Sequence, residues 1–128
     1  MSQQEIINYW FEKAEQDLAC ARDNHEAGRL LNAVRDAYFA CFHAFSSVLL
    51  KGGKTFSKHK EVRSMLHRDY IRANKIAVQW GKHYDWLFEN RQKADYRPLV
   101  QFDPEQVKEI IDESEAFIKE MKRLTQSE

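Results

Sequence analysis

The 128-residue sequence contains few residues that cross-link a chain or interrupt its helices: two cysteines, two prolines and four glycines. The cysteines form no CxxC motif and no HExxH motif occurs, so a zinc site has no support. No apolar run approaches the roughly 18 residues of a membrane-spanning helix. The N-terminus is acidic and amphipathic, without the basic and apolar regions of a secretory signal. We therefore expect a cytoplasmic protein with no membrane contact, no metal and no cofactor.

The two cysteines, Cys20 and Cys41, both fall on apolar helical stripes. In a reducing compartment such thiols behave as small hydrophobic side chains. We expect both to be buried, without a disulfide between them.

Helical periodicity runs through the chain, with apolar residues recurring every three or four positions and no sustained strand-like alternation. Gly28 and the pair Gly52-Gly53 should end the first two helices, which the tight first connection folds into an antiparallel hairpin. Ser57 is a suitable N-cap for a third helix. Asn74 and Gly81 are the weak points where a turn should follow it.

A fourth helix should stop near Tyr96, because Pro98 disfavours helix at the residue before it. Asp103 is placed as the N-cap of a last helix, with Pro104 at its first position. The length suits one domain over residues 1–128. The sequence thus predicts an all-α, up-and-down bundle of about five helices.

The net charge of zero hides an uneven distribution. Residues 51–83 carry nine lysines and arginines against two acidic residues, whereas residues 1–50 and 103–128 are acidic. Such a basic block is typical of a surface that meets nucleic acid or an acidic protein. Alternatively, the basic helix lies between the acidic ones and neutralises them within the fold. The sequence leaves both readings open.

Arg91 and Asp95 are the first candidates for a site. They lie four residues apart and continue the apolar stripe of the fourth helix. A solvated pair at this spacing contributes only about 0.2–0.5 kcal/mol. A charged pair on an inward face is better explained by a partner surface or a cleft.

A second group lies in the first turn of the third helix, where Lys58, His59 and Lys60 follow one another. The helix dipole disfavours positive charge there, so a bound phosphate would explain the cluster. A tolerated surface cluster is the alternative. His43 lies near the edge of the aromatic stripe of the second helix and is either a core histidine or part of a cleft.

Together these segments resemble the HEPN superfamily in its small, single-domain prokaryotic form. The resemblance covers nearly the whole chain and rests, in order, on AEQDLACARDNHEAGRLLNAVRDAYFACFHAFSSVLL, SKHKEV and RQKADY. It implies a helical bundle that usually dimerises and is often encoded beside a minimal nucleotidyltransferase as a toxin–antitoxin-like pair. Many members are metal-independent ribonucleases with an arginine followed, after four to six residues, by a histidine.

Arg91 matches the motif arginine, but Tyr96, Arg97 and Pro98 stand where the histidine would be. The ADY ending resembles the branch of the family in which the motif is altered. In relatives a tyrosine near the motif can be modified by the paired nucleotidyltransferase, which makes Tyr96 a candidate for modification. The resemblance implies Arg91, Asp95 and Tyr96 as catalytic candidates. The candidates for binding a nucleotide or phosphate are Lys58, His59, Lys60, His43 and Lys93.

Three functions stay open. The first is a nucleotide- or RNA-binding partner of a minimal nucleotidyltransferase, with Arg91, Asp95 and Tyr96 lining a dimer cleft. The second is a metal-independent endoribonuclease toxin, in which Arg91 contacts phosphate and Asp95, Tyr96, His43 or His59 moves protons. The third is a structural dimerisation module. All three predict a homodimer.

Overall fold

The computed structural model describes residues 1–54, 58–98 and 100–126. Over these residues it contains five α-helices and no strand, which confirms the predicted all-α bundle. The helices are α1 (Gln3–Glu26), α2 (Leu30–Lys51), α3 (His59–Met65), α4 (Val78–Tyr96) and α5 (Pro104–Gln126), and the π-helical segment η1 (Leu66–Ile71) continues α3. No described helix has the length and apolarity that spanning a membrane requires.

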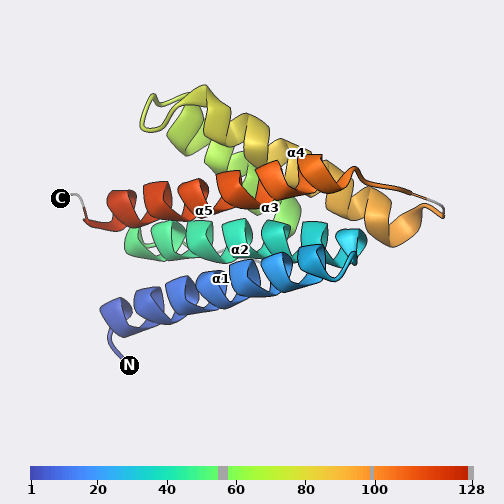
Figure 1. Cartoon of the computed structure of the whole chain (residues 1–128). Coiled ribbons are helices and arrows are strands. Elements are labelled where there is room, and N and C mark those ends of the chain that lie inside the picture. The colour runs from blue at the N-terminus through green and yellow to red at the C-terminus, as the bar shows by residue number, and fades with distance from the viewer. Residues whose placement is uncertain (55–57, 99, 127–128) are drawn as a thin grey trace.

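The central element is α2, which contacts α1, α4 and α5. Figure 1 shows α1, α2 and α5 side by side, α4 inclined to them, and the start of α1 at the same end of the bundle as the end of α5. Every residue from Ala40 to Leu49 is buried. A helix that is apolar on all sides is buried on all sides. The apolar, aromatic sequence of α2 therefore explains its position at the centre of the bundle.

The helix ends follow the predicted local chemistry. Gly28, just beyond α1, has a φ of 79°, which a glycine adopts without steric cost. The Asp103 carboxylate accepts a hydrogen bond from the backbone N–H of Gln106 at 3.0 Å and caps α5. Arg97 is extended (φ −109°, ψ 129°) and ends α4 immediately before Pro98.

The loop before α4 corrects one expectation. The turn contains Asn74 at a φ of 58°, as predicted, but Gly81 lies inside α4 and is buried. A Cβ at Gly81 would stand 2.8 Å from Cε1 of His67. This glycine therefore permits a close approach of α4 to η1 and marks no turn. The predicted cap Ser57 lies outside the described residues.

The cysteine expectation is half wrong. Cys41 is buried, and burial raises the pKa of its thiol to about 12. Cys20 is exposed. The core stripe of α1 is narrow and leaves Cys20 on its solvent side; it consists of Ile7, Phe11, Ala14, Leu18 and Ala21.

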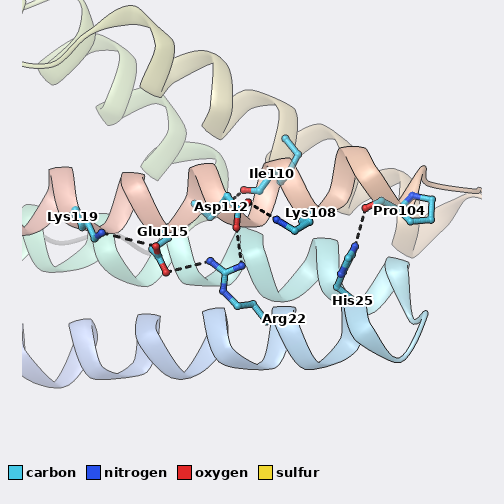
Figure 2. A network of polar contacts seen from close by, with 9 residues as sticks. Arg22, His25, Pro104, Lys108, Ile110, Asp112, Glu115 and Lys119 are labelled. Carbon is cyan, nitrogen blue, oxygen red and sulfur yellow. Dashed lines mark hydrogen bonds and ion pairs between the residues drawn. The ribbon is translucent and has the colours of Figure 1, made fainter.

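Polar contacts between α1 and α5 fix how these two helices lie against each other (Figure 2). The Arg22 guanidinium binds Asp112 at 2.8 Å and Glu115 at 3.2 Å. About one turn closer to the end of α1, Nε2 of His25 donates a hydrogen bond to the carbonyl oxygen of Pro104 at 2.8 Å. Because half-exposed ion pairs contribute roughly 0–1 kcal/mol each, they set the register of the two helices more than the stability of the fold.

The Gly81 position gives a stability prediction. Gly81→Ala should lower the free energy of unfolding by about 1–3 kcal/mol, because the new methyl group overpacks the contact with His67. This loss should outweigh the roughly 1 kcal/mol that alanine gains over glycine inside a helix. Urea denaturation followed by circular dichroism measures the difference.

The matched control removes the imidazole. In the background His67→Ala, the Gly81→Ala change should be clearly less destabilising than in the wild type, because only the 3.2 Å approach of Cγ1 of Ile71 then opposes the gain in helix propensity. A stabilising effect of Gly81→Ala in the wild-type background would contradict the close-approach argument.

His83 gives a pH prediction. Its Nε2 lies 2.9 Å from Oγ of Ser114, which itself donates to the Ile110 carbonyl, so the imidazole is the donor. Burial lowers the pKa of His83 from 6.5 to about 4. Between these values the unfolded chain takes up a proton that the folded chain does not, so stability should fall by about 3 kcal/mol as pH drops from 6.5 to 4.

The comparison for this prediction is His83→Gln, which has no titrating group. Stability curves at several pH values between 7 and 4 should be less steep for this variant than for the wild type. Equal slopes in this range would show that the Glu113 carboxylate, 3.2 Å from Nδ1, accommodates the proton in the folded state.

Candidate functional site

Arg91 lies on the inward side of α4, against the rings of α2. Its guanidinium carbon stands 4.8 Å from the ring centre of Tyr38 and 5.7 Å from that of Phe39. Both distances fit cation–π contacts. The side chain is 17% exposed, and Nε is buried without a hydrogen-bond partner among the described residues. The arginine is therefore held in a fixed orientation by aromatic rings.

The only carboxylate found near Arg91 among the described ion pairs is shared. Asp95 lies 3.4 Å from Arg91 and 3.2 Å from Nε of Arg35 on α2. One negative charge thus faces two positive ones, and the trio retains a surplus positive charge. No spacing in the sequence linked Arg35 to Asp95, because the two residues are on different helices.

His59 belongs to the same cluster and turns inward from the first turn of α3. Its Nδ1 lies 2.7 Å from the Tyr38 hydroxyl, and its ring stacks on Phe42 with the ring centres 4.3 Å apart. Burial is the main cause that lowers the pKa of His59, and the positive charge of Arg91 and the nearby His43 lower it further. The imidazole is therefore neutral near pH 7, when it can accept a proton.

His43 supplies a second imidazole beside these rings. Its Nδ1 lies 2.6 Å from a carboxylate oxygen of Asp17 on α1. The ring stacks against Trp10, with the ring centres 5.2 Å apart, and against Phe39, with the centres 5.9 Å apart. Only 9% of the residue is exposed. The sequence had left His43 as either a core or a cleft residue, and the structure places it buried beside the rings of the Arg91 cluster.

The other predicted residues lie apart from this cluster. Lys58 and Lys60 are exposed and line a shallow hollow with Met65 and Arg68. Lys93 and Tyr96 line a different hollow at the end of α4, and Tyr96 is 81% exposed. The proposed first-turn cluster is thus divided, with His59 facing the core and its two lysine neighbours facing solvent.

Sequence reasoning missed three members of the site: Asp17, Arg35 and the hydroxyl of Tyr38. Tyr38 belongs to the aromatic stripe of the second helix, and its ring is fully buried. One signal in the sequence could have revealed the Tyr38 hydroxyl. A tyrosine in a core needs a hydrogen-bond partner for its hydroxyl, and His59 at the start of α3 can provide one. Within the described chain, no group of three or more His, Cys, Asp or Glu side chains is placed to hold a metal ion.

The fold and the cluster define a small helical bundle with a cationic site lined by aromatic rings. The chain belongs to the HEPN domain family, whose sequence model matches residues 7–124. It is 36% identical over 121 residues to a UPF0332 protein of Thermotoga maritima, covering 94% of this chain and 92% of the relative.

Two relatives come from Methanocaldococcus jannaschii. The one named "Putative toxin MJ0605" is 29% identical over 119 residues, covering 93% of this chain and 88% of its own length. The one named "Putative toxin MJ0142" is 23% identical over 112 residues, covering 88% of this chain and 76% of its own length. The resemblance to the HEPN superfamily is confirmed.

The link between Arg91 and His59 is measurable. In the wild type the pKa of His59 should lie below 6.5, and Arg91→Ala should raise it, because a nearby positive charge that opposes protonation is removed. Part of the lowering should persist, since burial is the larger cause. Titration of the imidazole carbon-bound protons by NMR measures both values.

Arg123→Ala is the matched control, because it removes a guanidinium from α5 that pairs with Glu120 at 2.6 Å. It should leave the pKa of His59 unchanged. An equal response to both substitutions would mean that overall charge acts on His59, with no specific contribution from Arg91.

Proposed function

We propose that this protein is a toxin-type HEPN component whose Arg91 cluster binds the phosphate of RNA or of a nucleotide. The observation that carries the proposal is the surplus positive charge at Arg91, Asp95 and Arg35, held at fixed geometry against aromatic rings. A guanidinium presents several donors that match phosphate oxygens. Two relatives bear the toxin name, which supports this class of function.

The surroundings of Arg91 suit a single-stranded nucleic acid. Phe39 and Trp10 are only partly buried, and stacking of a base on an exposed part of an aromatic side chain contributes roughly 1–3 kcal/mol. The exposed lysines Lys58 and Lys60 flank His59 and could follow the backbone beyond the first phosphate. RNA bases that are splayed from a helix are recognised in this manner.

The proposal extends to partners and location. The protein forms a homodimer, its partner is a minimal nucleotidyltransferase, and it acts in the cytoplasm. Tyr96, at 81% exposure, is open to an enzyme that modifies its hydroxyl. These points rest on what the family implies and on the accessibility of that side chain.

A second candidate is a metal-independent endoribonuclease. The observation in its favour is His59, a neutral imidazole that shares Tyr38 with Arg91 although it lies outside the family motif. A histidine that titrates near neutral pH is the usual general acid or base. Tyr96 and Asp95 are less suitable as the general acid or base. Tyr96 is exposed to solvent, and the Asp95 carboxylate is paired with two arginines.

The binding proposal is tested with Arg91. A short, fluorescently labelled single-stranded RNA of mixed sequence should bind the wild type in an anisotropy assay. Arg91→Ala should weaken binding by about 10- to 100-fold, which corresponds to the loss of a charge-assisted hydrogen bond. The slope of log affinity against log salt should also decrease by about 1, because one phosphate contact is lost.

Arg123→Ala, which removes the same charge far from the cluster, should bind like the wild type. In cells, expression of the wild type should inhibit growth, and Arg91→Ala should relieve the inhibition. If Arg91→Ala binds RNA and inhibits growth as the wild type does, Arg91 is not the phosphate ligand.

A further inference from the structure

A hollow of about 420 Å³ lies at one end of the bundle, where residues of α2, η1, α5 and the turn before α4 line it. Figure 1 shows the end of α2 beside the end of α5, and the two helices are in contact. At about 1.5 Å per residue, Lys51 in this hollow stands roughly 20 Å further along α2 than Tyr38. The hollow is therefore separate from the Arg91 cluster.

Tyr70 of η1 lines this hollow and carries a polar group that the fold does not use. The residue is only 8% exposed, and its ring meets Phe45 edge-on with the ring centres 5.3 Å apart. A Cβ placed on Gly52, which also lines the hollow, would stand 3.8 Å from the Tyr70 hydroxyl oxygen. Within the described ranges, no residue makes a hydrogen bond to this hydroxyl. Because polar groups of buried residues are nearly always paired, the hydroxyl indicates a ligand.

The protonation state of Tyr70 shows which kind of ligand group it suits. Burial is the main cause that raises the pKa of Tyr70, while the nearby Lys54 lowers it and Asp69 raises it. The hydroxyl therefore keeps its proton near neutral pH and can donate a hydrogen bond. The matching group on a ligand is an acceptor, such as a carboxylate or phosphate oxygen.

Two lysines in the same hollow add positive charge. Nζ of Lys75 lies over the Tyr70 ring, 5.2 Å from its centre, and the backbone N–H of Lys75 donates to the Tyr70 carbonyl at 2.8 Å. Lys51 lines the hollow from the end of α2. Neither lysine forms an ion pair with any residue that the structure describes. Arg123 also lines the hollow, but Glu120 already occupies its guanidinium through hydrogen bonds of 2.6 and 3.1 Å.

Helix dipoles explain only part of this arrangement. A cation in the last turn of a helix is favoured by about 0.3–1 kcal/mol, which accounts for Lys51 at the end of α2. Lys75 instead lies in the turn beyond η1, outside the last turn of any helix. The dipoles also give no reason for the unpaired hydroxyl of Tyr70. A bound anion accounts for all three groups.

We propose that this hollow binds a small molecule that carries a carboxylate or phosphate group. The anionic oxygens contact the ammonium groups of Lys51 and Lys75 and accept a hydrogen bond from the Tyr70 hydroxyl. Val48 and Leu124 form apolar parts of the wall, against which the rest of the ligand packs. The volume lies within the roughly 300–1,000 Å³ of small-molecule sites. This site is independent of RNA binding at Arg91, so each proposal can fail alone.

The first experiment locates the site by NMR on the full-length protein. Inorganic phosphate and butyrate, which carry the two candidate groups, are titrated separately at constant ionic strength. At least one of them should give saturable shifts of the Tyr70 ring protons and of the Gly52 and Lys75 amides. The probe that binds more tightly identifies the anionic group. The same shifts should persist in Arg91→Ala, because the hollow does not involve the Arg91 cluster.

The second experiment tests the three groups by substitution. Tyr70→Phe keeps the ring and removes only the hydroxyl, so it should weaken binding of the probe about 10-fold, as expected for one hydrogen bond to a charged group. Lys51→Gln and Lys75→Gln should each weaken it roughly 2- to 5-fold, because these lysines are exposed. Binding of the labelled RNA should be unchanged in Tyr70→Phe.

Lys82→Gln and Tyr9→Phe are the matched controls. Lys82 is an exposed lysine of the same basic block and also forms no ion pair with a described residue, but it does not line the hollow. Tyr9 carries a hydroxyl on α1, outside the hollow, and is 50% exposed. Both variants should bind the probe like the wild type.

Three results would overturn the proposal. Shifts at Tyr70 that are absent, or that rise without saturation for both probes, would show that the hollow is not a binding site. Unchanged affinity in Tyr70→Phe would remove the hydroxyl as a ligand. Equal weakening by Lys82→Gln and Lys75→Gln would mean that the probe responds to overall charge. If RNA fails to bind while the Tyr70 shifts saturate, only the proposal at Arg91 fails.

Discussion

Tyr38 contributes to the core and to the candidate site at once, because its ring is fully buried while its hydroxyl reaches His59. The ring also meets Tyr84 and Phe88 of α4, and its face contacts the Arg91 guanidinium. Interiors are close-packed, so this ring cannot move without displacing its neighbours. The relative positions of Arg91 and His59 are therefore fixed when the core forms and do not wait for a ligand.

The helices were predictable because their signals are local. Apolar spacing, the Asp103 cap and the proline after Arg97 each act within a few residues. The prediction of a turn at Gly81 was wrong. A glycine is needed there because a side chain of η1 comes close to α4, and no local sequence pattern reveals that contact. The same limit applies to the site. Periodicity assigned Arg91 and His43 to helix faces, but the pairing of Asp17 with His43 joins two residues that are 26 positions apart in the sequence and lie on different helices.

The structure also bears on the basic block over residues 51–83. Its Arg63 faces Asp85 and Glu89 of α4, and its Lys54 and Arg68 share Asp69 of the block itself. The acidic helix α5 instead binds Arg22 of α1. Among the ion pairs of the described residues, no lysine or arginine of the block meets the acidic flanking segments. These ion pairs give no support to neutralisation of the block by those segments.

The contrast between the two cysteines has a practical consequence. Cys41 is enclosed by the core, and its pKa of about 12 keeps the thiolate scarce at neutral pH. Cys20 stands on the outer surface of α1. A thiol-reactive spin label should therefore attach at one place in each chain without any engineered substitution. The separation between two such labels would report directly how two copies of the molecule are arranged.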